Sequence, residues 1–284
     1  MKRVLTIQDI SCLGKCSLTA VIPVLSAMEL EPVILPTTIL SAHTEFESPY
    51  VKDLTEIMEP IAAHWKSQGI TFDSLSCGYL GSKGQMAVVK KIFEDFKRPG
   101  VLTVIDPAMG DYGRLYEGFD MDYVVEMRRF CSVGDVLLPN LTEAAYLLDM
   151  KYEELPGDRE GFDALIKKLA KLNRGIVVLK GIHLTKDKEA VLAYDSQTEE
   201  IVFYEREHLD AKLSGTGDIF TAVCQGALTK GLQLAEAVEL AMDFVLECMR
   251  KTIEDKNHRW YGVNLEEALP LLYEKNAALQ MKDN

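Results

Sequence analysis

The chain of 284 residues has no long uninterrupted apolar run and no excess of basic residues. The apolar run that follows Met1-Lys2-Arg3 stops at Gln8-Asp9, too early for a signal peptide, and no stretch approaches the ~20 residues that span a membrane. A formal net charge of −13 argues against a general nucleic-acid-binding surface. We therefore expect a cytoplasmic protein that binds neither membranes nor nucleic acids. A local cluster of backbone amides with one or two lysines can still bind ATP.

Two familiar nucleotide-binding motifs are also missing. The loop after the first predicted strand, residues 8–15, has neither the Gly-x4-Gly-Lys-Ser/Thr pattern of P-loop NTPases nor the Gly-x-Gly-x2-Gly pattern of dinucleotide-binding proteins. The six cysteines are dispersed, and the Cys12-x-x-x-Cys16 pair has no second Cys/His pair at a zinc-binding spacing. These absences argue against P-loop NTPases, nicotinamide dehydrogenases and zinc–thiolate proteins, and they favour reduced cysteines.

Strand and helix patterns alternate along the chain. Apolar runs and turn signals predict strands at residues 3–8, 31–35, 74–79, 101–106, 136–138 and 175–180, and a hairpin of 190–195 with 200–205. Helical periodicity covers residues 18–28, 51–65, 85–96, 123–131, 142–148, 161–172, 218–230, 234–256 and 265–278. This order predicts a central, mostly parallel sheet with helices on both faces. No linker, repeat or low-complexity tract divides the chain, so we expect one α/β domain over residues 1–284. Ligands in such sheets bind beyond the carboxyl ends of the strands.

The most informative segment is Ser214-Gly215-Thr216-Gly217-Asp218, which opens a strongly apolar helix. Glycines let backbone N–H groups turn toward a bound anion, and a helix N-terminus adds partial positive charge. Asp218 beside such an anion hole can take a proton from a hydroxyl that attacks a phosphoryl group. The alternative is a plain turn in which Asp218 only caps the helix.

Polar side chains also follow several of the predicted strands. Asp9, after the first strand, suits recognition of a small polar ligand, or else it caps the loop. Tyr79, between glycines at a strand end, can lay its ring against a planar ligand, or else it is a core tyrosine. His43 is either a ligand contact or a structural histidine.

The strand at residues 101–106 runs into Asp106-Pro107-Ala108-Met109-Gly110-Asp111. Asp106 is placed to hold Mg²⁺ through water or to shape a phosphate site. The continuation from Asp111 to Tyr116, with Gly110 and Gly113 as hinges, is typical of a mobile cover over a site.

Two more strand ends carry a carboxylate and an amine. Glu143 lies in the first turn of a helix that Asn140 or Thr142 can cap, and capping explains most of this motif. Lys180, followed by Gly181, is placed for a phosphate contact, although a snorkelling lysine is the alternative. The coincidence of polar groups at so many strand ends favours one shared site.

Taken together, these motifs resemble the ribokinase-like superfamily, and within it the pyridoxal kinases. The resemblance covers nearly the whole chain, and its motifs stand at 7–8, 41–44, 78–82, 106–111, 139–143, 180–181 and 215–218. The glycine–aspartate motif specifies the superfamily, whereas Tyr79 and the 106–111 segment point to the vitamin B6 branch.

The resemblance implies ATP-dependent phosphorylation of the 5′-hydroxymethyl group of pyridoxal, pyridoxine or pyridoxamine. It makes Asp218 the catalytic base and the amides of Gly215, Thr216 and Gly217 the anion hole. Thr44 is then expected to hydrogen-bond the ring substituents, and Tyr79 to pack on the ring. Asp106, Glu143 and Lys180 are then expected to contact the ATP phosphates and Mg²⁺, with Asp106 and Glu143 nearest the metal. The segment containing Arg206, His208 and Leu209 is expected to line the nucleotide pocket, and the resemblance also implies a homodimer.

The chain departs from the family pattern at Asp9, where the family usually has serine. A carboxylate there favours a protonated ring nitrogen or a substrate amine, so the preferred B6 vitamer stays open. The nearest alternative activity is that of a hydroxymethylpyrimidine kinase of thiamine synthesis. A non-catalytic regulator that binds B6 or nucleotide is a further alternative, against which the intact Asp218 argues.

Overall fold

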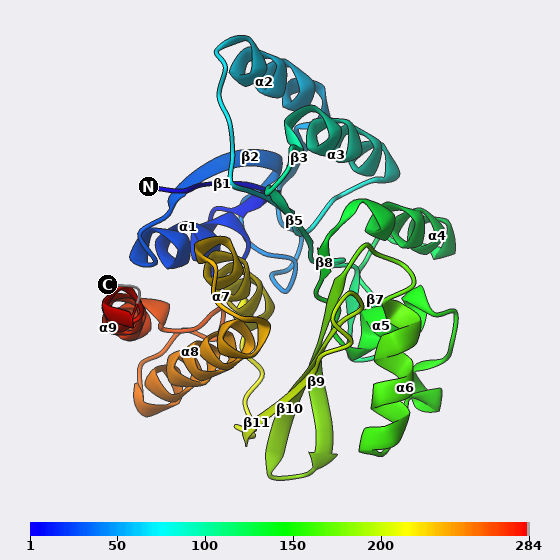
Figure 1. The fold of residues 1–284 in the computed structure, drawn as a ribbon, viewed down its shortest axis with the longest axis vertical. Helices are drawn as coiled ribbons and strands as arrows, with labels where there is room; N and C mark the ends of the chain where they lie inside the picture. Colours follow the sequence, from blue (N-terminus) through cyan, green and yellow to red (C-terminus); the bar gives the residue numbers. More distant parts are fainter. Residues whose placement is uncertain (283–284) are drawn as a thin grey trace.

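The computed structural model describes residues 1–282, with side chains described as far as residue 275. Within these residues, one sheet is formed by β1 (Arg3–Ser11), β2 (Glu31–Leu40), β3 (Val51–Asp53), β4 (Ser74–Cys77), β5 (Leu102–Ile105), β8 (Val136–Leu137), β9 (Ile176–Thr185), β10 (Lys188–Asp195) and β11 (Ile201–Glu207). Its spatial order is β11-β10-β9-β8-β5-β4-β1-β2-β3 (Figure 1). The strands from β9 to β2 in this order are parallel, and β3, β10 and β11 are antiparallel to their neighbours.

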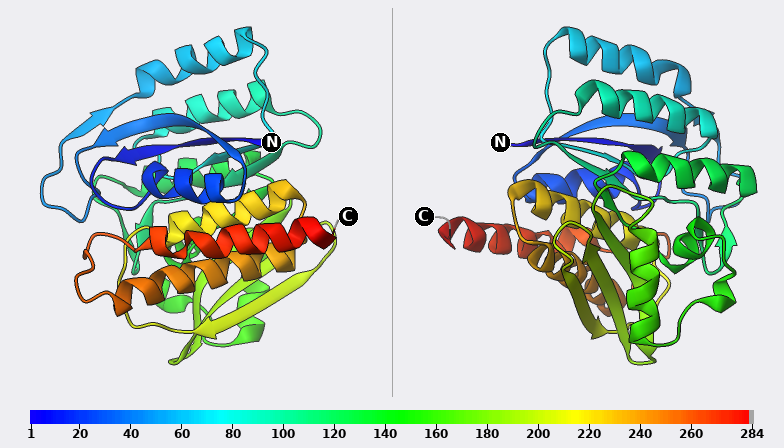
Figure 2. Two further views of the ribbon diagram at one scale, coloured as in Figure 1. Left: turned by 90° about the vertical axis from the view of Figure 1, so that its left-hand side faces the viewer. Right: turned by 45° about the vertical axis from the view of Figure 1, so that its right-hand side comes forward.

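Helices cover both faces of this sheet. One face carries α1 (Leu18–Ala27), α7 (Thr216–Lys230), α8 (Leu234–Glu254) and α9 (Leu265–Lys282), which lie side by side (Figure 2). The other face carries α2 (Thr55–Ser67), α3 (Lys83–Phe96), α4 (Met121–Phe130), α5 (Leu141–Leu147) and α6 (Arg159–Leu169). The short pieces are β6 (Gly110–Asp111), β7 (Arg114–Leu115), η1 (Cys131–Val133) and η2 (Tyr152–Glu154). The prediction of an α/β protein with helices on both faces of a mostly parallel sheet is confirmed.

The apolar residues fall into two clusters, one on each side of the sheet. In β1, Leu5 and Ile7 face one cluster and Val4 faces the other, and all three are fully buried. This double burial explains why the central strands are near-continuous apolar runs rather than alternating ones. No helix of the part described is both long enough and apolar enough to cross a membrane.

The chain reverses its direction of sheet growth between β1 and β4. From β1 it crosses to β2 on one side, whereas β4, β5, β8 and β9 follow on the other. Ligands of open parallel sheets bind in the crevice at such a switch point, beyond the carboxyl ends of the strands. Asp9 lies near the end of β1, and Tyr79 lies just after β4.

The structure corrects several of the predicted element boundaries. The strand predicted at 175–180 continues to Thr185, so Lys180 lies inside β9 rather than at its end. Residues 51–53 are not the start of a helix but the edge strand β3, and α2 begins only at Thr55. The second predicted strand continues beyond Pro36 to Leu40. Proline is tolerated here because β3 pairs only with Thr38–Leu40, so Pro36 has no neighbouring strand on that side to receive an N–H group.

Candidate active site

The head of α7 fits closely against the loop that follows β1. Gly215 has φ 87°, in the left-handed region, and a Cβ built there would lie 1.9 Å from the carbonyl oxygen of Lys15. Both the backbone conformation and the close approach therefore require glycine. The backbone of residues 215–217 leads directly into the first turn of α7, where Asp218 stands.

Asp218 is half-buried at this helix start. Oδ2 of its carboxylate accepts a hydrogen bond from the backbone N–H of Ser17 at 2.8 Å. Burial raises the pKa of Asp218 to about 7, with a contribution from the negative charges of Asp106 and Asp9, while the Ser17 N–H and Lys180 act in the opposite direction. A carboxylate that exchanges its proton near neutral pH is suited to general base catalysis.

Asp9 lies beside Asp218 and shares a partner with it. Oδ1 of Asp9 accepts a hydrogen bond from Oγ of Ser17 at 2.5 Å, and Oδ2 accepts one from Oγ of Ser11 at 3.1 Å. Burial raises the pKa of Asp9, although both hydroxyl hydrogen bonds oppose that shift. Ser17 therefore joins the two carboxylates, that of the buried Asp9 through its side chain and that of the half-buried Asp218 through its backbone. No local sequence signal marks Ser17, because its role depends on the fold of the loop after β1.

A second polar group joins Asp106, directly after β5, to Lys180, which lies inside β9 rather than at its end. Nζ of Lys180 donates to Oδ2 of Asp106 at 2.9 Å, and Oγ1 of Thr221 donates to the same oxygen at 2.5 Å. Burial by itself lowers the pKa of Lys180, but the neighbouring carboxylates of Asp106 and Glu143 raise it above its ordinary value. Lys180 therefore stays protonated. Thr221 was missed in the sequence, although its position three residues after Asp218 places it on the same face of α7.

Glu143 forms the capping box of α5 that its sequence indicates. Its backbone N–H donates to Oδ1 of Asn140 at 2.9 Å, and its Oε2 accepts the N–H of Asn140 at 2.8 Å. Its Oε1 also accepts the N–H of Met109 at 3.3 Å. Burial raises the pKa of Glu143 well above its usual range, and the negative charge of Asp106 adds to this shift. Glu143 thus belongs to the same charged cluster while holding the segment after β5.

A small hairpin of β6 and β7 stands beside this cluster. Tyr112 and Gly113 form its turn with φ values of 49° and 77°, and the N–H of Gly113 donates to Oγ1 of Thr142 at 2.8 Å. The ammonium of Lys212 lies 5.2 Å from the centre of the Tyr112 ring. The hairpin corresponds to the segment that the sequence predicts as a cover. Tyr116, directly after this hairpin, is half-buried, and desolvation together with the charge of Glu143 raises its pKa.

The segment before the anion hole is connected to the loop after β2. Nζ of Lys212 lies 3.0 Å from Oε1 of Glu45, and Oγ of Ser214 donates to Oε2 of the same residue at 2.7 Å. Because Lys212 also lies near the ring of Tyr112, the loop after β2, the β6–β7 hairpin and residues 212–214 meet at one place.

The remaining predicted residues have different surroundings. Tyr79 stacks on Phe119, with ring centroids 5.5 Å apart, and the nearby charge of Asp9 contributes to its raised pKa after burial. Thr44 is exposed. His43 is buried, and its Nε2 lies 3.2 Å from the carbonyl oxygen of Tyr261.

The predicted nucleotide-pocket residues lie around β11. Nε of Arg206 donates to Oδ1 of Asp243 on α8 at 2.8 Å, and its guanidinium stacks on Tyr204, 3.9 Å from the ring centre. His208 lies beside Glu189 on β10, and Leu209 follows it. Each of these contacts is made within β10, β11 and α8, and none of them reaches Asp218.

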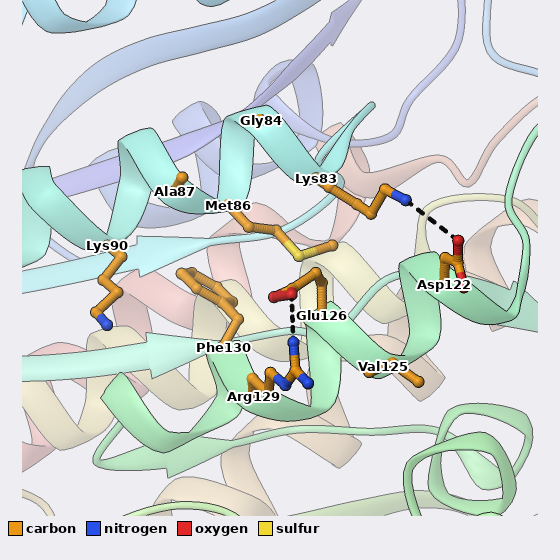
Figure 3. A pocket seen from close by; sticks show the side chains of 10 residues that line it. All are labelled: Lys83, Gly84, Met86, Ala87, Lys90, Asp122, Val125, Glu126, Arg129 and Phe130. Carbon is orange, nitrogen blue, oxygen red and sulfur yellow. Dashed lines mark hydrogen bonds and ion pairs between the residues drawn. The ribbon is translucent and has the colours of Figure 1, made fainter.

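A cavity of about 790 Å³ lies elsewhere, in a groove between α3 and α4 (Figure 3). Charged side chains on its rim pair with one another: Lys83 with Asp122 at 3.7 Å and Arg129 with Glu126 at 2.7 Å. Its lining includes none of the predicted site residues. A much smaller cavity, of about 10 Å³, is lined by Asp106, Asp218 and Thr221, and it has room for roughly one water molecule.

A glycine-rich helix start with a half-buried acid, set at the carboxyl ends of a mostly parallel sheet, defines the chain as a member of the ribokinase-like kinases. The sequence matches the model of the phosphomethylpyrimidine kinase family over residues 14–261, and the chain belongs to that family.

Solved structures agree with this assignment. A putative phosphomethylpyrimidine kinase from Bacteroides thetaiotaomicron, crystallised with pyridoxal, is 37% identical with a TM-score of 0.91, and the match covers 95% of each chain. Pyridoxal kinase from Lactobacillus plantarum is 31% identical with a TM-score of 0.88, covering 97% of this chain and 98% of that one. Pyridoxal kinase from Leishmania donovani, in complex with ADP and pyridoxamine, shares the fold at 21% identity, with a TM-score of 0.85 and 96% of each chain covered. The predicted likeness to pyridoxal kinases is confirmed.

Proposed function

We propose that this protein transfers the γ-phosphoryl group of ATP to the 5′-hydroxymethyl group of a B6 vitamer. The observation that carries the proposal is Asp218, half-buried at the start of α7 beside the Gly215–Gly217 backbone, with its pKa raised to about 7. Pyridoxal bound to the Bacteroides relative and ADP with pyridoxamine bound to the Leishmania one support this choice of substrates.

In this proposal Asp218 accepts the proton of the attacking hydroxyl group as the new oxygen–phosphorus bond forms, while the bond from the γ-phosphorus to the bridging oxygen breaks and ADP leaves. The N–H groups of residues 215–217 and the partial positive charge of the helix start stabilise the negative charge on the transferred group. Lys180, held protonated by Asp106 and Glu143, contributes a further positive charge for the phosphates. The β6–β7 hairpin covers the reacting groups and excludes water.

The vitamer is assigned to the switch point between β1 and β4. We assign Asp9, near the end of β1 and next to Asp218, to a contact with a basic ring substituent. Tyr79 offers a ring face, and Thr44 offers a hydroxyl for hydrogen bonding. Arg206, His208 and Leu209 stay predicted residues of the nucleotide pocket.

Mg²⁺ fits the donor set at Asp106. Both side-chain hydrogen bonds to Asp106 end on Oδ2, so Oδ1 is available to a hard cation or to its water. Glu143 already accepts two backbone N–H groups, so we assign it an indirect, water-mediated role. When bound, Mg²⁺ neutralises charge on the ATP phosphates.

Hydroxymethylpyrimidine is the second candidate substrate, and it is favoured by the family to which the chain belongs. It presents a similar hydroxymethyl group on a heteroaromatic ring. Phosphate transfer from labelled ATP to pyridoxal, pyridoxine, pyridoxamine and hydroxymethylpyrimidine decides between them. We expect the highest kcat/KM for a B6 vitamer. Higher efficiency with the pyrimidine contradicts the proposal, and no transfer to any of the four favours a non-catalytic binding protein.

A further inference from the structure

Three potential metal ligands, His183, Glu189 and His208, converge at one end of the antiparallel part of the sheet. His183 lies on β9, Glu189 lies at the start of β10, and His208 directly follows β11. Strand pairing explains this convergence: Glu189 is paired with Arg206, and the N–H of His208 donates to the carbonyl oxygen of Asp187 at 2.9 Å. Side chains distant in sequence are thus neighbours at this end of the sheet.

The geometry of the three side chains is close to that of a metal site. One ligand atom from each lies within 4.8 Å of the other two. Nδ1 of His208 is 3.5 Å from Oε2 of Glu189, near enough for an ion pair, yet this buried nitrogen forms no hydrogen bond. Two ligands of a tetrahedral zinc ion stand about 3.4 Å apart when each lies at ~2.0–2.1 Å. A metal ion between these two atoms therefore requires little movement.

His183 supplies the third ligand. Its ring centroid is 4.7 Å from that of His208, and the two planes are inclined by 79°. His183 is exposed, so its side chain can rotate toward the other two without disturbing the core. No other group of three or more such ligands was found in the part of the chain that the structure describes.

We propose that His183, Glu189 and His208 bind a divalent transition metal ion, zinc in the first instance. Two imidazoles and one carboxylate suit zinc, cobalt or nickel, whereas magnesium prefers oxygen ligands. The site is separate from the Asp106 and Asp218 cluster and does not depend on the proposed function. His208 becomes a metal ligand, which is an alternative to the nucleotide contact predicted for it.

The position of His208 gives this site a structural consequence. His208 directly precedes residues 209–214, which lead into Gly215 and hold Glu45 through Lys212 and Ser214. A metal ion bound to β9, β10 and His208 fixes the start of this segment. We therefore expect bound zinc to raise the melting temperature as well as to join the three side chains.

The test is calorimetric titration of zinc chloride into chelator-treated full-length protein in excess Mg²⁺. Cys12, an exposed thiol, is replaced by Ser in every variant so that it cannot bind zinc. We expect one zinc ion per chain, with affinity at least about tenfold weaker in His183→Ala, His208→Ala and Glu189→Gln. His64→Ala removes an exposed histidine on α2 and serves as the matched control, in which affinity stays unchanged.

Cobalt(II) substitution gives an independent readout through the visible absorption of the bound ion, which we expect to be lost in His183→Ala/His208→Ala. Melting curves without metal show whether each variant is folded. Binding of zinc by the double variant with the affinity of the parent overturns the proposal, as does the absence of any zinc binding by the folded parent.

Discussion

The backbone N–H of Ser17 donates to Oδ2 of Asp218 at 2.8 Å, across 201 positions of the sequence. Ser17 makes this bond from a backbone conformation of φ 50° and ψ −137°, which a residue with a side chain rarely adopts. Its hydroxyl meanwhile donates to Asp9. The loop after β1 thus stores backbone strain at the point where it orients the proposed base, as is common at functional sites.

Replacing Asp218 with Asn tests the proposed base. We expect turnover to fall by about 10²–10⁴-fold, because the amide cannot accept the proton of the hydroxyl group. ATP binding, measured by calorimetry, is expected to persist because the anion hole is built from backbone. Retention of most activity by the purified variant excludes Asp218 as the base.

The same variant provides a control on the electrostatics. Burial raises the pKa of Asp218 from its ordinary value of 3.8 to about 7. Between pH 3.8 and pH 7 the unfolded chain therefore ionises this group more readily than the folded protein does, so the free energy of unfolding falls as the pH rises through this range. Asp218→Asn should therefore melt higher than the parent, by a margin that grows up to about pH 7 and is constant above it. A margin that does not change with pH contradicts this account.

The pH profile of the reaction follows from the same shift. Below about pH 7 Asp218 is protonated and cannot act as a base, so kcat/KM should fall about tenfold per pH unit on the acid side. Above pH 7 the carboxylate is ionised and this dependence disappears. Initial rates between pH 5.5 and 8.5 measure the effect, and the residual activity of Asp218→Asn should lack the acid limb. A flat parent profile across this range argues against Asp218.

Asp9 is expected to set the preference among B6 vitamers. A carboxylate that contacts the amine of pyridoxamine forms a charge-assisted hydrogen bond of roughly 1.5–3 kcal/mol, equivalent to about tenfold or more in efficiency. Asp9→Ser should lower kcat/KM for pyridoxamine more than for pyridoxal. Asp9→Asn keeps the shape without the charge and should shift the preference similarly.

The competing explanation for Asp9 is structural, because its carboxylate also accepts hydrogen bonds from Ser11 and Ser17. In that case kcat/KM falls equally for pyridoxamine and pyridoxal, and the melting temperature falls in both variants. Equal losses of kcat/KM for the two vitamers, together with a lower melting temperature, exclude a role of Asp9 in specificity.

Replacing Gly215 with Ala tests the close contact between residue 215 and the carbonyl oxygen of Lys15. A control variant is needed because the same change also strains the backbone. Gly118 has the same φ of 87°, but a Cβ there would meet nothing within 4 Å, so Gly118→Ala is a matched control. Both variants should lose about 1–2 kcal/mol of stability from the left-handed conformation. Only Gly215→Ala should also displace the loop at Lys15 and lower kcat by about 10²-fold. An equal change of kcat in Gly215→Ala and Gly118→Ala contradicts a functional role for the contact with Lys15.

Removal of divalent ions tests the proposed metal. Excess chelator should abolish turnover, because Lys180 alone does not neutralise ATP in so acidic a protein. Added Mg²⁺ should restore the rate fully, because carboxylate and phosphate oxygens are the ligands that this ion prefers. Unchanged turnover in chelator counts against the kinase function itself.

The sequence by itself determined the alternation of strands and helices, the two-sided sheet and the positions of Asp9, Tyr79 and Asp106 near or directly after strand ends. These follow from local patterns, since apolar runs and turn residues act over a few positions. The capping role of Glu143 was equally local, because Asn140 stands three residues before it. Lys180, in contrast, lies inside β9, which continues to Thr185.

Only the tertiary structure decided how these positions interact. Ser17 and Thr221 join the carboxylates through contacts between distant elements, and no local pattern distinguishes them from ordinary hydroxyl residues. The same holds for the pKa of Asp218, which depends on burial and on charges that the fold alone brings near. The surroundings of His208 could not be predicted from the sequence either. Its neighbours on β9 and β10 are set by strand register, and register depends on pairing across the whole sheet.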